Sequence, residues 1–297
     1  MLNVTKTAAE KRKAFKDGIN SGTLQRVPGA FSPLVARLLE EQGFDGIYIS
    51  GAVLSADLGL PDIGLTTLTE VATRGHQIAR STNLPCLIDV DTGFGEPMSS
   101  YRTMVEMENQ GLAGFHLEDQ LNPKRCGHLD NKEVVPTEVM VRRIKAAVEA
   151  RKDPNFTIMA RTDARSMEGL EAAINRAKAY VDAGADAIFP EAMKDESDFE
   201  AFRKGIDVPI LANMTEFGKS DLLTTTQMQN LGINLVIYPV TSLRLAMGAV
   251  ESAFERIRDE GTQEGVVPDM QTRARLYELL NYEDYNKFDT SIFNFKV

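Results

Sequence analysis

Carboxylate, guanidinium and amide side chains occur directly after apolar runs of this sequence. In chain order they are Ser50 with Gly51, Asp89 and Asp91, Glu118 and Asp119, Arg161 and Asp163, Glu191, Asn213 and Thr215, and Arg244. A polar residue after one strand is ordinary, because strand ends face loops and solvent. Several such ends that combine carboxylates with two arginines instead indicate a site for a metal ion and a multiply charged acid.

The segment DVDTGFGE (89–96) places two carboxylates two residues apart. On an extended chain, side chains at this spacing point to the same side, so Asp89 and Asp91 can face one ion. A small number of oxygen ligands suits Mg²⁺, which keeps water ligands and takes further oxygens from a substrate. Histidines occur only at positions 76, 116 and 128, which argues against a zinc site. The alternative is a pair of aspartates that only cap a strand end.

Arg161 and Arg244 are candidates for recognition of the acid. A guanidinium group can bind a carboxylate through two parallel hydrogen bonds. Asn213 and Thr215 would add neutral donors to the same ligand. The alternative for each arginine is a structural ion pair with a nearby aspartate.

Cys126 lies in the basic segment KRCGHLDNK (124–132) and is one of only two cysteines. A metal ligand, a nucleophile, a proton donor and a plain loop residue are all open roles for it. The basic neighbours should lower the pKa of its thiol below the usual value of about 8.5. The second cysteine, Cys86, follows Pro85 at the start of an apolar run, and we expect it to be buried in the core.

Eight apolar runs with β-strand character must position these side chains. They cover residues 27–31, 46–50, 86–90, 114–118, 157–161, 187–191, 209–213 and 235–239. The runs are almost continuous in apolar residues, which is typical of strands covered on both faces. Helical patterns lie between them, and over residues 170–181 and 243–257 apolar side chains recur at helical spacing.

Proline and glycine alternate at the starts of these strands. Prolines lie at or before the odd-numbered strands and glycines before the even-numbered ones: Pro28, Pro85, Pro154, Pro209 and Gly43, Gly111, Gly184, Gly232. Eight strand–helix units in about 230 residues predict a (β/α)8 barrel of the TIM type, whose active site lies at the C-terminal ends of the strands. A doubly wound sheet is the alternative, but no G-x-G-x-x-G turn follows the first strand.

We interpret the chain as a single domain with three parts: an N-terminal arm or helix below the barrel (1–25), the barrel (26–260) and a C-terminal helical extension (261–297). The extension carries three of the seven tyrosines and several phenylalanines. A closed barrel has little core to offer these rings, so we expect them to pack on a neighbouring subunit. The alternative is that they cover their own barrel.

The composition limits the classes of partner. The net charge of −10 and the isoelectric point near 5.0 argue against nucleic acid or an anionic membrane. The charged N-terminus is unlike a secretory signal, and no apolar run approaches the ~18 residues of a membrane span. Two cysteines do not form a disulfide framework. We therefore expect a cytoplasmic protein with a small-molecule substrate.

Eight motifs together resemble the isocitrate lyase/phosphoenolpyruvate mutase superfamily, and within it the 2-methylisocitrate lyases. They are GLPDIG (59–64), DVDTGFG (89–95), HLEDQ (116–120), KRCGH (124–128), MARTDA (159–164), FPEA (189–192), LANMTEFG (211–218) and MQTRARLYE (270–278). The likeness spans residues 24–285 approximately, in family order. KRCGH is the motif most specific to the lyase branch, whereas DVDTGFG is shared across the superfamily.

The resemblance implies Mg²⁺-dependent cleavage of a tricarboxylic acid, 2-methylisocitrate, to pyruvate and succinate in the methylcitrate cycle of propionate catabolism, by a homotetramer. Asp89 and Asp91 would hold Mg²⁺, with Glu118 in its outer shell. The implied substrate-binding residues are Ser50, Gly51, Ala52, Gly127, His128, Arg161, Glu191, Asn213, Met214, Thr215, Arg244 and Arg273. Ala52 departs from the expected glycine. Phe189 and Pro239 fall where this branch makes room for the extra methyl group.

The implied retro-aldol reaction needs a base for the hydroxyl proton, a cation for the oxyanion and an acid for the carbanion. In this reaction Cys126 fits the role of the acid that donates a proton to the carbanion, and Tyr48 is the candidate for the base that removes the hydroxyl proton. Sibling lyases that act on 2,3-dimethylmalate or oxaloacetate are the nearest alternative, because they share the fold and the metal site. A non-catalytic barrel that binds a dicarboxylate is the remote one, and it would have no need of Cys126.

Overall fold

The computed structural model describes residues 2–125, 127 and 132–293, and this part of the chain contains eight strands. They are β1 (Gln25–Pro28), β2 (Ile47–Ile49), β3 (Cys86–Asp89), β4 (Gly114–Glu118), β5 (Thr157–Thr162), β6 (Ala187–Pro190), β7 (Leu211–Asn213) and β8 (Leu235–Tyr238). Each one overlaps one of the eight predicted runs, so those predictions are confirmed.

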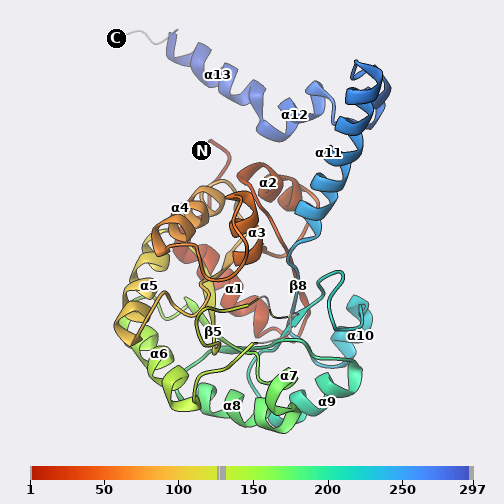
Figure 1. Ribbon diagram of the computed structural model, residues 1–297. Helices are drawn as coiled ribbons and strands as arrows, with labels where there is room; N and C mark the ends of the chain where they lie inside the picture. Colours follow the sequence, from red (N-terminus) through yellow and green to blue (C-terminus); the bar gives the residue numbers. More distant parts are fainter. Residues whose placement is uncertain (1, 126, 128–131, 294–297) are drawn as a thin grey trace.

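The strands form a closed parallel barrel (Figure 1). Hydrogen-bonded pairing runs β2-β3-β4-β5-β6 in one sheet and β1-β8-β7 in the other. Two isolated parallel bridges join the sheets, Gly29 with Tyr48 and Ile188 with Ile210. Because the order around the ring follows the order along the chain, the doubly wound alternative is excluded and the (β/α)8 barrel is confirmed.

Helices alternate with the strands and surround the barrel (Figure 1). They are α2 (Pro33–Glu41), α3 (Gly51–Asp57), α4 (Leu68–Ala79), α5 (Pro97–Asn109), α6 (Thr137–Ala150), α7 (Arg165–Glu168), α8 (Leu170–Asp182), α9 (Glu196–Gly205) and α10 (Thr225–Asn230). Four of these helices stop at a predicted glycine with left-handed backbone: φ is +75° at Gly43, +84° at Gly111, +104° at Gly184 and +73° at Gly232. Glycine adopts this conformation without steric cost, which explains the stops.

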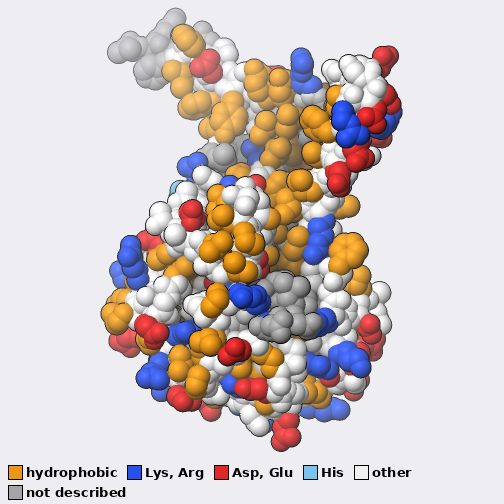
Figure 2. Space-filling view, viewed as in Figure 1, with side chains coloured by type: hydrophobic (Ala, Val, Ile, Leu, Met, Phe, Trp, Pro, Cys, Tyr) orange, Lys and Arg blue, Asp and Glu red, His pale blue; other side chains and the backbone are white. Residues whose placement is uncertain are grey.

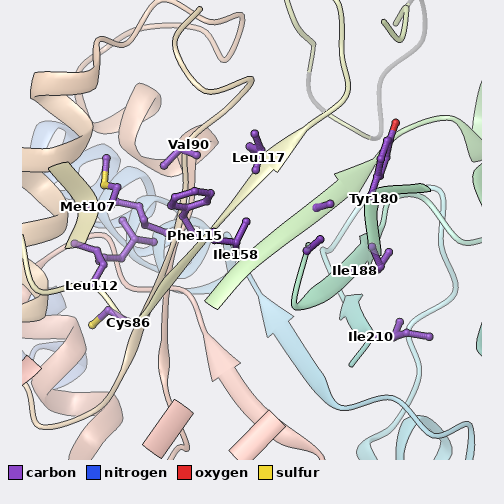
Figure 3. Packing of buried hydrophobic residues seen from close by; sticks show 14 of the residues in the cluster. Cys86, Val90, Met107, Leu112, Phe115, Leu117, Ile158, Tyr180, Ile188 and Ile210 are labelled. Carbon is purple, nitrogen blue, oxygen red and sulfur yellow. The ribbon is translucent and has the colours of Figure 1, made fainter. Parts of the chain in front are cut away.

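Apolar side chains pack in two layers. One layer lies between the strands and the helices, where Phe115 of β4 and Met107 of α5 are buried (Figure 3). The other fills the barrel interior and includes Tyr48 and Leu87. Successive strand residues therefore alternate between the two layers, as strands covered on both faces require. The predicted burial of Cys86 is confirmed, because the residue is 2% exposed.

Helix α1 (Ala8–Ile19) closes the N-terminal end of the barrel. Thr7 and Glu10 form a capping box that fixes the start of the helix. Phe15 and Ile19 on its inner face join the interior cluster and are almost fully buried. The N-terminal segment is therefore a packed helix in this structure.

The chain ends in a C-terminal arm that extends away from the barrel (Figure 1). The arm consists of α11 (Thr241–Glu260), a 3-10 helix η1 (Glu264–Asp269), α12 (Arg273–Leu280) and α13 (Tyr282–Phe293). The predicted helical spacing over 243–257 is right, but the apolar stripe does not cover the barrel, since Leu245 and Phe254 are 70% and 65% exposed. Hydrophobic side chains gather on this arm (Figure 2).

The arm also contacts its own barrel through α12. Arg275 of α12 forms a 2.7 Å ion pair with Glu41 of α2, and Leu279 beside it is buried. Most rings of the arm nevertheless stay exposed, including Tyr285, Phe288 and Phe293. No helix in the described residues is long and apolar enough to span a membrane.

Candidate active site

A small cavity lies at the C-terminal ends of the strands, where the sequence predicted a site. It is lined by Tyr48, Ser50, Ala52, Asp62, Asp89, Lys124, Gly127, Arg161, Phe189, Glu191, Asn213, Thr215, Pro239 and Val240. Its volume of about 50 Å³ corresponds to about two water molecules.

The predicted pair of aspartates meets at the end of β3. The Gly51 amide donates to Asp89 Oδ2 at 3.2 Å, and the Asp91 amide donates to Asp89 Oδ1 at 3.0 Å. The backbone here is not extended as predicted: Asp91 has φ of +47°, so a left-handed turn brings the two carboxylates together. Burial raises the pKa of Asp91 to about 6, which shows how costly two adjacent buried negative charges are.

Glu118, at the end of β4, is 1% exposed, and neither of its carboxylate oxygens accepts a hydrogen bond. Its nearest charge is the Arg161 Nε atom at 3.3 Å from Oε2. Burial raises the pKa of this carboxyl group well above its ordinary value. Two buried carboxylate oxygens without a hydrogen-bond donor are suited to a metal ion or its bound water.

Lys124 supplies a cation that the sequence argument did not place in the site. Its ammonium group is 2.7 Å from Asp91 Oδ1 and forms a short contact with Asp62 Oδ1. Burial alone would lower the pKa of Lys124, but attraction by the surrounding carboxylates, Glu118 first, raises it. Asp62 belongs to the GLPDIG motif, so that motif was the signal for this residue.

The buried charges at the cavity do not balance. Five carboxylates are almost fully buried there, namely Asp89, Asp91, Glu118, Asp163 and Glu191. The buried cations that contact these carboxylates, among the described residues, are Lys124, Arg161 and Lys132. Carboxylates therefore outnumber cations here, and a divalent cation would offset this imbalance.

The donor set fits Mg²⁺ better than a metal held by protein alone. In residues 2–125, 127 and 132–293, no three His, Cys, Asp or Glu side chains converge closely enough to bind a metal ion. Mg²⁺ takes one or two carboxylates and keeps water or substrate oxygens as its remaining ligands. Asp89 and Asp91 would hold the ion, and Glu118 would contact its water.

Arg161 of β5 forms the opposite wall of the cavity. Its Nε and Nη2 atoms donate to Asp163 at 2.9 and 3.2 Å, and its guanidinium lies 5.1 Å from the centre of the Phe189 ring. The Glu191 carboxylate is 3.7 Å away. Although burial opposes the charged form, the attraction of Asp163 and Glu191 raises the pKa of Arg161. Arg161 therefore has the predicted structural ion pair and also faces the cavity.

Tyr48 lies in the cavity, but its environment does not suit a base. Burial, followed by the charge of Asp89, raises its pKa well above 10, so the phenolate is disfavoured. Its hydroxyl group is 2.7 Å from His116 Nε2, and burial lowers the pKa of His116 to about 4, so the imidazole is neutral. This environment disfavours the predicted role of Tyr48 as the base, and the contact given for its hydroxyl group is to His116.

Of the predicted binding residues 213–215, two have side chains in the cavity and one does not. Asn213 and Thr215 line the cavity. Met214 between them does not, because its side chain is buried and its sulfur accepts the Leu223 amide at 3.2 Å. This prediction for Met214 is wrong, since alternation along the chain turns its side chain away from the cavity.

Arg244 stands at the edge of the cavity. Its Nη1 atom lies 2.7 Å from Glu216 Oε2 and 3.3 Å from Thr215 Oγ1, and Phe217 stacks on the guanidinium at 5.3 Å. Glu216 and Phe217 were missed, although both belong to the motif LANMTEFG. Arg273 is not brought to this site, because it is exposed on α12 in the C-terminal arm. Cys126 and His128 lie outside the described residues.

Sequence comparison gives a consistent assignment. Residues 15–258 match the phosphoenolpyruvate phosphomutase family. The chain is 63% identical to probable 2-methylisocitrate lyase 1 of Corynebacterium glutamicum, over 96% of this chain and 94% of that protein. It is 45% identical to 2-methylisocitrate lyase of Halalkalibacterium halodurans, over 97% and 95% of the two chains.

Solved structures share the whole architecture. 2,3-Dimethylmalate lyase, a member of the PEP mutase/isocitrate lyase superfamily, superposes with a TM-score of 0.89 at 30% identity, covering 99% of both chains. Phosphonopyruvate hydrolase in complex with oxalate and Mg²⁺ superposes with a TM-score of 0.86 at 31% identity, covering 94% of this chain and 98% of that one. With its barrel, its cavity and its matched motifs, this chain belongs to the phosphoenolpyruvate phosphomutase family of the PEP mutase/isocitrate lyase superfamily.

Proposed function

We propose that this protein is a Mg²⁺-dependent carbon–carbon lyase that cleaves 2-methylisocitrate to pyruvate and succinate, as in the methylcitrate cycle of propionate catabolism. The observation that carries the proposal is the cavity at the strand ends, which is lined by both Asp89 and Arg161, with the Asp91 amide hydrogen-bonded to Asp89 beside it. The names of the relatives at 63% and 45% identity support this substrate. The Mg²⁺ complex of phosphonopyruvate hydrolase supports the metal.

The keto-acid end of the substrate would lie between the aspartates and Arg161. When bound to Asp89 and Asp91, Mg²⁺ would act as a Lewis acid that stabilises the alkoxide formed when the C2 hydroxyl loses its proton, before the C–C bond breaks. The Gly51 amide already points at Asp89, and a Cβ atom on Gly51 would approach that carboxylate to 2.9 Å, so the helix start lies directly against the metal position. Arg161 would bind the pyruvate carboxylate, and the Tyr48 hydroxyl would donate to the oxyanion.

The succinyl end would lie toward β7. Asn213 and Thr215 would donate to its carboxylates. Arg244 now pairs with Glu216, and it would bind a substrate carboxylate in place of the Glu216 carboxylate. Cys126 remains our proposed donor of the proton that the succinate carbon receives after cleavage. A thiol suits this step because its pKa is near neutral.

The substrate class is testable with a panel of acids. Phe189 and Pro239 line the cavity, and in this proposal they would contact the extra methyl group. Pyruvate release with Mg²⁺ should be fastest from 2-methylisocitrate, compared at equal concentration with isocitrate, 2,3-dimethylmalate and oxaloacetate. Faster release from 2,3-dimethylmalate or oxaloacetate would assign the protein to a sibling activity instead.

We also propose a homo-oligomer, with a tetramer as the expected form, working in the cytoplasm. The supporting observation is the C-terminal arm, whose exposed side chains include Leu245, Phe254 and Phe293. Such a face is stabilised when a second copy covers it. Arg273 on this arm would then serve the site of a neighbouring copy.

The assembly and the role of Arg273 have separate tests. Light scattering after size exclusion should give a multiple of the 32.8 kDa chain, and Phe254→Asp should reduce it. A monomeric wild type would refute the assembly. Mixing the inactive variants Arg273→Met and Cys126→Ser should restore activity only if Arg273 acts in a neighbouring subunit.

A further inference from the structure

Lys132 is a buried lysine at the active site that the proposed chemistry does not use. Its side chain is only 2% exposed, although lysine is rarely buried. Backbone pairing fixes the segment around it: the Leu121 amide donates to the Glu133 carbonyl at 2.8 Å, and Gln120 forms an antiparallel bridge with Val134. Lys132 therefore enters the site from a paired backbone segment.

The Lys132 ammonium group has two partners in the site. It donates to Asp163 Oδ1 at 2.8 Å and, through a short contact, to the Gly127 carbonyl. Asp163 is fully buried and also accepts both hydrogen bonds from Arg161. One buried carboxylate is thus shared by the guanidinium that faces the substrate and by Lys132.

Gly127 is packed directly against the same arginine. A Cβ atom at Gly127 would overlap Arg161 Nη2 and the Glu191 side chain, so only glycine fits here. The close approach presses the Gly127 backbone onto the wall of the cavity. Lys132 is the side chain that holds the Gly127 carbonyl in this position.

We propose that Lys132 is a positioning residue that orients Arg161 through Asp163 and seats Gly127 against it. A buried ammonium group is costly unless it is paired, and here its two partners belong to the two elements that enclose the keto-acid end. Without Lys132, Asp163 can rotate with Arg161, and the Gly127 carbonyl loses its buried donor. The inference rests on the proposed function, because it assigns a task within that site.

Lys132→Met is the central variant, because it keeps the length and apolar stem of the side chain and removes the charge. We expect kcat/KM for 2-methylisocitrate to fall about 100-fold, mostly through kcat, since small displacements of an aligned group have this effect. The control is Lys152→Met, an exposed lysine far from the cavity, which should match the wild type. A purely structural role would instead lower the melting temperature and leave kcat per folded molecule unchanged, which would overturn the proposal.

A second measurement does not depend on turnover. Trypsin cleaves after Arg125, whose backbone amide donates to the Gln120 side chain at 2.8 Å. If Lys132 anchors Gly127, trypsin should cut the Lys132→Met variant after Arg125 several-fold faster than the wild type. If the methionine variant does not fold, the same measurement is made on Lys132→Gln. Equal cleavage rates would refute the anchoring of Gly127. Absence of turnover in the wild type, with faster cleavage in the variant, would reject the proposed function and leave the anchoring intact.

Discussion

Replacement of Tyr180 by phenylalanine removes one hydroxyl group from a buried network behind the active site. Tyr180 of α8 is fully buried, and its hydroxyl donates to Asp119 Oδ2 at 2.8 Å. Asp119 also accepts from the Thr162 hydroxyl at 2.8 Å and from the Asp163 amide at 2.9 Å. The same hydroxyl accepts a longer hydrogen bond from Arg176 Nη1 at 3.3 Å. Loss of the hydrogen bond to the charged Asp119 alone costs about 1.5–3 kcal/mol, so we expect the free energy of unfolding to fall by roughly 2 kcal/mol or more.

Equilibrium unfolding in urea at pH 8 measures this loss. Burial raises the pKa of Asp119 to about 6, so the carboxylate is ionised at pH 8 and needs its donors. The midpoint should shift to lower urea with an unchanged slope. Tyr101→Phe is the control, because Tyr101 is 39% exposed, and its effect should stay within about 0.5 kcal/mol. An equally small effect of Tyr180→Phe would show that the network does not stabilise the fold as described.

Three further predictions concern the cavity and the core. Gly127→Ala should lower kcat/KM by about 100-fold or more with little change in melting temperature. The control is Gly248→Ala, which has open space around it and should leave kcat/KM unchanged. A Gly127→Ala enzyme with normal activity would contradict the close packing. Mg²⁺ at 100 times its Kd should stabilise the wild type by about 2.7 kcal/mol. In a thermal-shift titration, the Asp91→Asn variant should lose most of this stabilisation. If Mg²⁺ stabilises the variant as much as the wild type, the metal binds elsewhere. In Cys126→Ser, the remaining Cys86 thiol, whose pKa burial raises to about 12, should react with a disulfide reagent at pH 8 only after unfolding. Rapid reaction of the folded protein would contradict its burial.

The order of strands and helices was predictable because its signals are local. Apolar runs mark the strands, and glycines such as Gly111 and Gly184 mark helix ends through a backbone conformation that other residues avoid. The barrel rule then places every strand end at one face. This is why Asp89, Arg161 and Glu191 could be assigned to one site before any contact was known.

The parts that could not be predicted depend on contacts between distant segments. Lys124 reaches Asp62, and Lys132 reaches Asp163, only because of the path of one loop across the strand ends. The left-handed turn at Asp91 is a tertiary property that the spacing of two aspartates does not reveal. The stripe on α11 showed that the helix is amphipathic, but a periodic pattern does not say which surface will cover it.

The most direct test of the central claim is cleavage of 2-methylisocitrate in D₂O with Mg²⁺, followed by ¹³C and ¹H NMR. Retro-aldol cleavage places solvent hydrogen only on the succinate carbon that formed the broken bond, because that carbon leaves as a carbanion. We predict pyruvate and succinate in equal amounts, with one deuterium in each succinate and none in pyruvate. Absence of products, or deuterium delivered to the pyruvate methyl group by the enzyme, would contradict the proposed lyase.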